Sequence, residues 1–191
     1  MPQVNVAYDL MTVEDYLAAE NDGSWRHEFI DGMVYAMAGA SERHSVIKVN
    51  VIGLLNVMIA QECRVFDGDM KLRITQEETT RFFYPDVFVS CTPPDDTQYF
   101  REDASLIIEV LSPSTQRIDR YEKMPVYKAL PSLSEYVLVE QDFPKIEIFR
   151  RRTGWRREVL EPDDPITLES IGQTLNFNQV YRRIDFVNPG S

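Results

Sequence analysis

The spacing of apolar residues along the chain predicts a protein that contains both helices and strands. Thr12 is expected to open a short helix. The pair Asp31-Gly32 separates apolar stretches within residues 25–37, which is typical of a β-hairpin turn. A long helix is expected over residues 42–62, and its wide apolar face suits packing against a sheet.

The rest of the chain alternates short apolar segments with polar loops, which predicts strands on both sides of a second helix. The expected strands cover residues 63–66, 71–75, 83–89, 105–111, 135–140, 146–150 and 155–160. Residues 92–98 form a predicted turn region, and the second helix is expected over 116–130, interrupted by Pro125.

The order of these elements indicates the fold class. Between residues 41 and 140 the core order is α-β-β-β-α-β, if the short piece at 63–66 is counted with its neighbour. This order favours an α/β or α+β fold with a mixed β-sheet flanked by helices.

The length of the chain, 191 residues, favours a single domain over 1–191. We expect an N-terminal helix and hairpin over about 12–38, the core over about 41–140, and C-terminal strands over about 144–185.

Composition narrows the range of functions. The chain has 20 Lys and Arg against 31 Asp and Glu, for a net charge of −11, and 43% of its residues are hydrophobic. This acidity argues against a protein that coats nucleic acid without sequence preference, because such proteins release counterions through excess Lys and Arg. It is compatible with a carboxylate site for a hard divalent cation.

Two features favour a cytoplasmic protein without a membrane partner. The N-terminus has no secretion signal, and the most apolar stretch, residues 46–60, is too short and too polar to span a bilayer. Cys63 and Cys91 form no disulfide framework. A disulfide is possible but not needed at this chain length, so a reducing compartment is expected.

Two acidic residues stand alone inside predicted apolar strands. Glu109 lies within Leu106–Leu111, and Asp86 lies within Phe83–Val89. A carboxylate in such a strand is costly unless it is paired or bound to a cation. If the strands pair, the two side chains could lie about 5 Å apart and hold Mg²⁺ or Mn²⁺. Hydrogen bonds to backbone amides or an ion pair with Arg would satisfy them equally well.

The same residues carry a resemblance to a known family. Pro85-Asp86 followed by Glu109-Val110-Leu111 resembles the signature of PD-(D/E)XK nucleases. Over about residues 10–185 the chain resembles more closely the Uma-type restriction-endonuclease-like proteins of bacteria. The matching positions are Glu28 to Gly32, His44, Tyr84 to Val87, Glu109 to Thr115, Asp119, Lys123, Tyr127, and residues 131–133 and 135–136.

The resemblance implies a divalent-metal-dependent phosphodiesterase, with Asp86 and Glu109 as ligands of Mg²⁺ or Mn²⁺. The nuclease signature expects a lysine where this chain has Leu111, so another cation must stabilise the phosphate charge. The subfamily resemblance implies a lysine displaced onto the next helix, which is Lys123. Lys71, on an earlier strand, is the alternative, and Lys123 could also be a solvated helix lysine.

Other residues are expected to support this site. Asp119 and Tyr127 lie one helical turn on either side of Lys123. Glu28 could be a second metal ligand or an acid behind the ligands, but a surface acid paired with Arg is equally plausible. His44 could bind phosphate or orient water, although a lone histidine more often packs or caps.

Basic residues are concentrated in one segment. Residues 117–157 hold ten basic and six acidic side chains, in contrast to the acidic remainder. Arg150, Arg151 and Arg152 begin a predicted hairpin tip that could contact nucleic-acid phosphates. A hairpin that is basic without binding nucleic acid fits the pattern equally well.

These observations lead to two classes of function. The first is a Mg²⁺-dependent endonuclease that cleaves DNA, working as a homodimer by analogy with other enzymes of this fold. The second is a catalytically inactive descendant that binds nucleic acid or protein, in which Leu111 reflects lost activity. A structural oligomer without metal is a further alternative.

Overall fold

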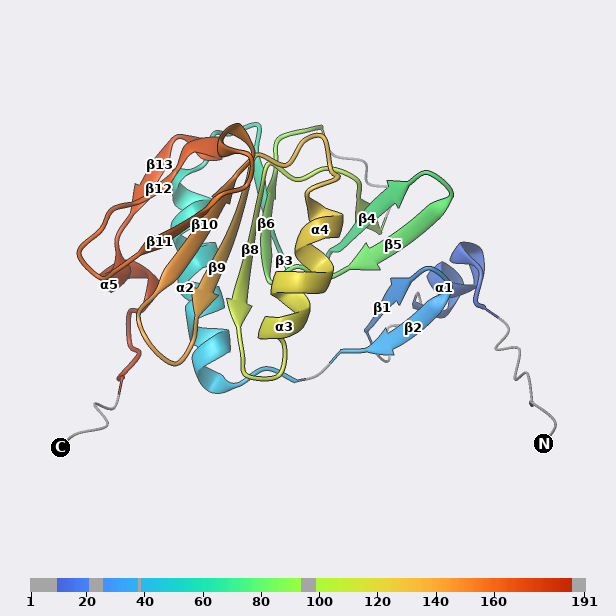
Figure 1. Ribbon diagram of the computed structural model, residues 1–191, viewed down its shortest axis with the longest axis horizontal. Helices are drawn as coiled ribbons and strands as arrows, with labels where there is room; N and C mark the ends of the chain where they lie inside the picture. The colour runs from blue at the N-terminus through green and yellow to red at the C-terminus, as the bar shows by residue number, and fades with distance from the viewer. Residues whose placement is uncertain (1–9, 21–25, 38, 94–98, 187–191) are drawn as a thin grey trace.

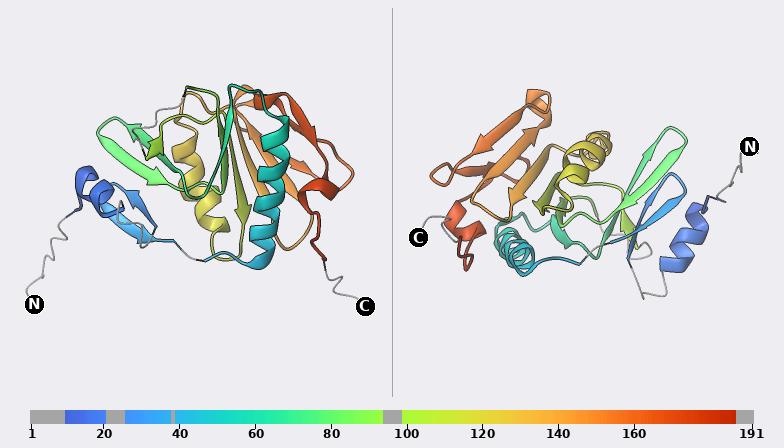
Figure 2. Two further views of the ribbon diagram at one scale, coloured as in Figure 1. Left: turned by 180° about the vertical axis from the view of Figure 1, so that it is seen from behind. Right: turned by 60° about the horizontal axis from the view of Figure 1, so that its bottom comes forward.

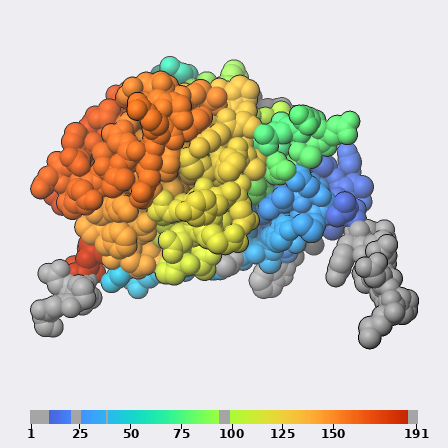
Figure 3. Space-filling view, viewed as in Figure 1, coloured from blue at the N-terminus to red at the C-terminus, as the bar shows by residue number. Residues whose placement is uncertain are grey.

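The strands of the protein form three sheets, and helices lie between and around them (Figure 1). The computed structural model describes residues 10–20, 26–37, 39–93 and 99–186. The N-terminal elements lie at one end of the molecule and the C-terminal strands at the other, with the helices that follow residues 41 and 115 between them (Figures 1 and 3).

The largest sheet has six strands in the order β11-β10-β9-β8-β6-β3. These strands are β3 (Arg64–Asp67), β6 (Val87–Ser90), β8 (Leu106–Leu111), β9 (Glu135–Glu140), β10 (Ile146–Arg150) and β11 (Arg157–Leu160). Strands β8 and β9 are parallel and the other neighbours are antiparallel, which confirms the mixed sheet predicted from the sequence.

Helices cover both faces of this sheet (Figure 2). One face packs on α2 (Glu42–Met58) through Leu106, Ile108 and Val110 of β8. The other face packs on α4 (Met124–Tyr127), and Ile107 and Leu111 belong to that second core. Because both faces are covered, every residue of β8 is buried, as its continuous apolar run predicts.

Within the six-stranded sheet and its helices the order is α2, β3, β6, β8, second helix, β9, which matches the predicted α-β-β-β-α-β order, but counting the piece at 63–66 with its neighbour at 71–75 is wrong. The strand predicted at 71–75 is not part of this core. It forms β4 (Lys71–Gln76), which pairs with β5 (Thr79–Phe83) in a separate five-stranded sheet.

The five-stranded sheet has the order β2-β1-β5-β4-β7 and contains the N-terminal hairpin. Its remaining strands are β1 (His27–Ile30), β2 (Met33–Ala36) and β7 (Phe100–Arg101). Helix α1 (Val13–Glu20) packs on it through Tyr16, which contacts Phe29 and Phe82. The structure therefore confirms the predicted helix and hairpin at the N-terminus.

The predicted strand at 83–89 is divided in two. Strand β5 ends at Phe83 and β6 begins at Val87, and the two strands belong to different sheets. Pro85 lies in the connection between these strands. Proline has no N–H to donate, so within a strand it would interrupt the ladder of hydrogen bonds. The break places Asp86 directly before β6 rather than in the middle of a strand.

The second helix is also divided. It consists of α3 (Gln116–Ile118), a π turn (Asp119–Lys123) and α4, and it ends before residue 130. Pro125 has no N–H for an α-helical bond to the fourth residue before it. The preceding N–H, that of Met124, instead bonds to the Asp119 carbonyl with π-helical spacing.

The long helix α2 ends at Met58, four residues before the predicted end at 62. Ile59 takes an extended backbone, and Cys63 N–H closes a turn to the Ala60 carbonyl before β3. The C-terminal part adds β12 (Ile166–Leu168), β13 (Gln173–Leu175) and α5 (Phe177–Val180); the sequence predicts C-terminal strands in this region but neither their positions nor the helix.

Cys63 and Cys91 form a disulfide, so the expectation of reduced cysteines is wrong. The antiparallel register of β3 and β6 pairs Arg64 with Ser90, which puts the two cysteines opposite each other one position further along. The turn predicted at 92–98 lies mostly outside the described residues. No helix in the described part of the chain has the length and apolar character to cross a membrane. Single-domain organisation and a cytoplasmic location stay predictions.

Candidate active site

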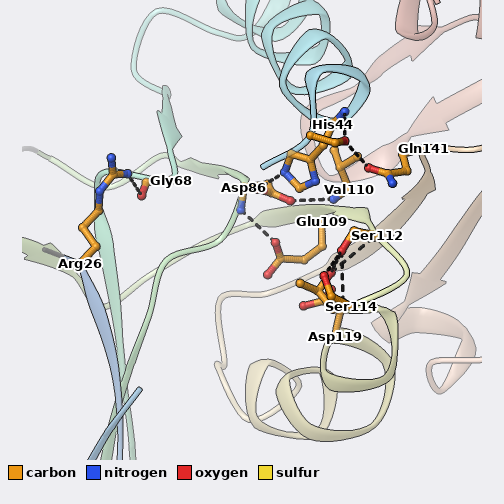
Figure 4. A network of polar contacts seen from close by, with 12 residues as sticks. Arg26, His44, Gly68, Asp86, Glu109, Val110, Ser112, Ser114, Asp119 and Gln141 are labelled. Atoms are coloured by element: carbon orange, nitrogen blue, oxygen red, sulfur yellow. Dashed lines mark hydrogen bonds and ion pairs between the residues drawn. The ribbon is translucent and has the colours of Figure 1, made fainter. Parts of the chain in front are cut away.

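Asp86 and Glu109 lie side by side on neighbouring strands of the six-stranded sheet. Strand β6 pairs with β8 so that Val87 is opposite Ile108, and the preceding residue, Asp86, therefore lies beside Glu109. The Asp86 N–H donates to Glu109 Oε2 over 2.9 Å, and the Val110 N–H donates to Asp86 Oδ2 over 2.8 Å (Figure 4). Each carboxylate is thus held by the backbone of the other strand.

Glu109 is almost fully buried, with 3% of its surface exposed. Its second oxygen, Oε1, accepts a hydrogen bond of 3.0 Å from the Tyr127 hydroxyl. Burial raises the pKa of Glu109 well above its usual value, and attraction to Lys123 opposes this rise. A bound cation would favour the ionised carboxylate further.

His44 belongs to the site as well. It lies in the first turn of α2, and its Nε2 is 2.8 Å from Asp86 Oδ1. Ser41 caps this helix by accepting the His44 N–H, and the Ser41 hydroxyl donates to Gln141 Oε1 at the end of β9. The start of the helix is therefore fixed to the sheet, and His44 is held against Asp86 (Figure 4).

The π turn places Lys123 on the face of the six-stranded sheet that α4 covers, which is the face opposite α2. Its Nζ lies 2.6 Å from Glu28 Oε1 and 3.7 Å from Asp119 Oδ1. Burial alone would lower the pKa of Lys123, but attraction to Glu109, Glu28 and Asp119 outweighs burial and raises it. Lys123 is therefore a permanently charged lysine held among carboxylates, and not a solvated helix lysine.

Lys71, the alternative to Lys123, lies elsewhere. It is buried, and its Nζ lies 5.5 Å from the centre of the Tyr84 ring. Burial lowers the pKa of Lys71, and its acidic neighbour is Glu20 of α1, not Glu109. Side chains alternate along β4, and Leu72 faces the core of α4 while Lys71 faces the opposite side.

Leu111 occupies the position where the nuclease signature has lysine. It is 1% exposed and packs in the core beside Tyr127. The space near this position is filled by apolar and aromatic side chains, so the cation of the site can come only from another element. Lys123, on the next helix, is the lysine whose charge attracts the Glu109 carboxylate and opposes the rise of its pKa.

Asp119 also lies in the site; the sequence indicates it as a position of the family resemblance and as a neighbour of Lys123. It is 3% exposed, and burial raises its pKa while Lys123 opposes the rise. The loop before it is closed by hydrogen bonds that join the Ser112 hydroxyl with the hydroxyls of Ser114 and Thr115 (Figure 4). The sequence signal for Asp119 is its spacing of four residues before Lys123.

The charges of these side chains do not balance. The carboxylates of Glu28, Asp86, Glu109 and Asp119 surround one lysine and one histidine. Ionising all four carboxylates at once is costly, which is why burial raises the pKa of Glu109 and of Asp119, and a further cation would favour their ionised forms. Carboxylate oxygens are the ligands that Mg²⁺ prefers. In charge and donor type, the residues therefore fit a divalent ion.

The described residues contain no cluster of three or more His, Cys, Asp or Glu that converges closely enough to hold a metal. Asp86 and Glu109 are a pair, and their oxygens already accept hydrogen bonds. This arrangement suits Mg²⁺, which is usually bound through one or two carboxylates and keeps several waters.

The predicted nucleic-acid contacts at the basic hairpin are partly wrong. Arg150 is buried, and its guanidinium contacts Glu135, Glu158 and the Thr167 carbonyl. It is therefore not available to a phosphate. The larger part of the predicted basic tip is likewise engaged within the protein.

Arg151 donates to the carbonyls of Leu133, Lys128 and Leu130. Arg152 pairs with Glu169 and keeps 64% of its side chain exposed. A phosphate contact by Arg151 or Arg152 stays a prediction, and each residue would have to leave its present partner to make one.

The fold and the carboxylate site define a restriction-endonuclease-like protein of the α+β class. Residues 13–178 match the family model Uma2, described as "Putative restriction endonuclease", and the chain belongs to this family. The matched segment contains every residue of the site described above.

Similar proteins are found in cyanobacteria. The uncharacterized protein slr1290 of Synechocystis sp. is 34% identical over 181 residues, covering 92% of this chain and 94% of the relative. A second uncharacterized protein of that organism, sll1609, is 34% identical over 146 residues, covering 74% and 81%.

A solved structure shares the fold. The crystal structure of a "putative nuclease belonging to DUF820" from Anabaena variabilis matches with a TM-score of 0.69 and 20% identity. The match covers 90% of this chain and 97% of that chain. Its likeness supports the arrangement of elements in this protein.

Proposed function

We propose that the protein is a Mg²⁺- or Mn²⁺-dependent endonuclease that hydrolyses phosphodiester bonds of DNA. The observation that carries the proposal is the pair Asp86 and Glu109, each held by a backbone amide of the other's strand, with Lys123 near the buried Glu109 carboxylate. Membership in a family of restriction-endonuclease-like proteins supports the same reaction class.

In this proposal Asp86 and Glu109 hold the metal. A bound divalent ion would supply a more acidic water and positive charge for the phosphate oxygens. The residues of the chain contribute rigidity: two backbone N–H groups and the Tyr127 hydroxyl fix the carboxylates before any ion binds. His44 holds Asp86 Oδ1 in place from the other side.

Lys123 has the role of a fixed cation. Its carboxylate neighbours keep it protonated at neutral pH, so it serves as a positive charge beside the phosphate and not as a base. Two carboxylates position its ammonium group: that of Glu28, which lies on β1, and that of Asp119, which lies in the π turn.

The proposal is tested by incubating the purified protein with supercoiled plasmid and single-stranded DNA in Mg²⁺ or Mn²⁺. Wild type is expected to nick or cleave DNA, and EDTA is expected to stop it. Glu109→Gln should reduce the rate by about 10²-fold or more, because it removes a charged ligand. Glu62→Gln, at an exposed position, is the matched control. No cleavage of either substrate by wild type in any metal would contradict the proposal.

A second candidate is a nuclease-like protein that binds nucleic acid without cutting it. The observation that favours it is Leu111, which packs in the core where the nuclease signature has lysine. It predicts metal-stimulated DNA binding with no cleavage product. Binding and cleavage measured in the same samples separate the two candidates.

A further inference from the structure

Strand β2 forms one edge of the five-stranded sheet and is unusually exposed. Among the described residues it pairs only with β1, and all of its residues are exposed. Met33 is 50% exposed, Val34 37% and Tyr35 44%, and the next apolar residue, Met37, is 38% exposed. Side chains on both faces of the strand are exposed, and no other described strand pairs with its outer edge.

Part of the backbone of this edge is left without a strand partner among the described residues. Asp31-Gly32 forms a two-residue turn with positive φ at both positions, and Ile30 pairs with Met33 to close the hairpin. In such a hairpin the alternate residues Val34 and Ala36 direct their N–H and C=O groups away from β1. A partner strand is the natural acceptor of these groups.

The edge lacks the features that usually prevent strand pairing. The segment from Gly32 to Met37 contains no charged residue and no proline, in a chain with 27% charged residues. Exposed edge strands are normally protected by lysine, proline or a bulge. Leu10, 63% exposed, and Met11, 38% exposed, extend the apolar surface at the turn, where Met11 N–H bonds to the Gly32 carbonyl.

The exposed apolar side chains lie on both faces of the strand, because side chains alternate along it. An edge-to-edge contact would bury part of this apolar surface together with the outward backbone groups of Val34 and Ala36. Contiguous exposed apolar surface commonly marks an interaction site.

We propose that the β2 edge pairs with the β2 edge of a second copy of the chain, in antiparallel orientation, and joins two five-stranded sheets. A strand paired antiparallel with itself obeys two-fold symmetry, so the one segment satisfies both copies. Centred on Tyr35, the pairing puts Val34 opposite Ala36 and sets no like charges against each other. Two copies that each carry a net charge of −11 repel each other, so association is favoured at a surface that holds no charged residue.

The position of this edge connects it with the candidate active site. Strand β1, the neighbour of β2, carries Glu28, whose carboxylate lies 2.6 Å from Lys123 Nζ. The pairing of β1 with β5 is short, covering Phe29 with Phe82 and Ile30 with Arg81. A partner strand on β2 would stiffen the hairpin that holds Glu28 against Lys123. The dimer itself rests on the strand geometry and not on the proposed nuclease activity.

The inference is tested by sedimentation velocity and light scattering of the full chain between 1 and about 100 µM, a range that brackets transient and stable interfaces. Wild type is expected at twice the chain mass of 22.2 kDa. Val34→Lys and Tyr35→Lys should each shift the protein to monomer, because they place like charges on the symmetric edge. Their circular dichroism and melting should show that the fold is intact.

Val57→Lys is the matched control, since Val57 is 78% exposed on α2, away from the edge. It should remain dimeric. A monomeric wild type would overturn the inference and assign the edge to another partner. Dimers that persist in both edge variants, or that Val57→Lys dissociates equally, would also overturn it. None of these results depends on whether DNA is cleaved.

Discussion

Glu109 is held by donors at both oxygens of its carboxylate, the Asp86 N–H and the Tyr127 hydroxyl. This detail explains why a charged residue is tolerated in the middle of the most buried strand. A carboxylate whose lone pairs are partly satisfied can be positioned before a cation binds. The single residue therefore serves both the stability of the sheet and the proposed chemistry.

Lys123→Met should impair the reaction more than it impairs folding. The substitution keeps much of the apolar stem but removes the charge, and loss of one group that stabilises transition-state charge typically costs about 10²–10³ in kcat. The measurement is kcat for plasmid cleavage, with melting temperature as a check on the fold. Lys71→Met is the control, because Lys71 lies beside Tyr84. The assignment is wrong if Lys71→Met abolishes cleavage and Lys123→Met does not.

His44 should act through Asp86. His44→Ala removes the contact to Asp86 Oδ1 and is expected to weaken Mn²⁺ affinity by about 10–100-fold, the usual effect of losing a group that orients a ligand. His44→Gln places an amide nitrogen near the same point and should restore part of the affinity. Equal affinities for wild type and His44→Ala, measured by calorimetry, would remove His44 from the site.

Much of the site could be predicted from single residues. Asp86 and Glu109 were identified because isolated acids in apolar strands need a partner, and the structure brings them together. Glu28 was left open between a site acid and a surface acid, since its partner, Lys123, lies on a distant element. The contact of Ser41 with Gln141, 100 residues apart, had no sequence signal at all.

At the scale of elements, the β1–β2 hairpin shows how a local signal can determine structure. Asp31 has φ of 51° and Gly32 has φ of 90°, values that fit a turn of the type that Asp-Gly favours. An alternating or continuous apolar run likewise determined β9 and β10, whose bounds agree with the prediction residue for residue.

Other elements could not be predicted because their sequences do not carry the expected pattern. Strand β5 begins with Thr79-Thr80-Arg81, which is polar and only half-buried. Strands β7, β12 and β13 have two or three residues each, too few for any periodicity to appear. Their positions follow from tertiary packing and not from local preference.

Gly32→Ala should destabilise the protein more than Gly154→Ala does. Both glycines have positive φ, so each substitution bears a backbone cost of about 1–2 kcal/mol. A Cβ at Gly32 would in addition lie 2.7 Å from Leu10 Cβ, whereas a Cβ at Gly154 meets no atom within 4 Å. The free energy of unfolding in urea measures the difference, and equal losses would mean that Leu10 does not pack on the turn.

At the scale of the whole molecule, the acidic and basic residues form ion pairs between elements and do not divide the protein into an acidic and a basic part. Glu147 is fully buried in β10 and contacts Arg120 of the π turn, Lys145 and Arg157. These contacts tie the helix that carries Lys123 to the far strands of the sheet. Most basic residues of segment 117–157 are therefore engaged in ion pairs or hydrogen bonds within the protein, at the surface as well as inside.

This network makes a definite prediction about pH. Burial alone would raise the pKa of Glu147, but hydrogen bonds from Arg157 and Arg120 outweigh burial and lower it to about 2. The ionised form is thus favoured by folding, so its contribution is complete above the unfolded pKa of about 4.5 and is lost as pH falls toward 2. The contribution is on the order of 2–3 kcal/mol.

The free energy of unfolding of wild type and Glu147→Gln, measured in urea from pH 6 to pH 3, checks this prediction. The difference between the two proteins should be largest near pH 6 and should shrink as the pH falls. A difference that stays constant over the whole range would show that ionised Glu147 is not favoured by folding.

The central claim is that the carboxylates of Asp86 and Glu109 bind a divalent metal, and titration with Mn²⁺ by isothermal calorimetry tests it most directly. Wild type is expected to bind one ion per chain, while Asp86→Asn with Glu109→Gln binds none and Glu62→Gln binds as wild type does. Absence of Mn²⁺ and Mg²⁺ binding by wild type, or unchanged binding by the double variant, would contradict the claim.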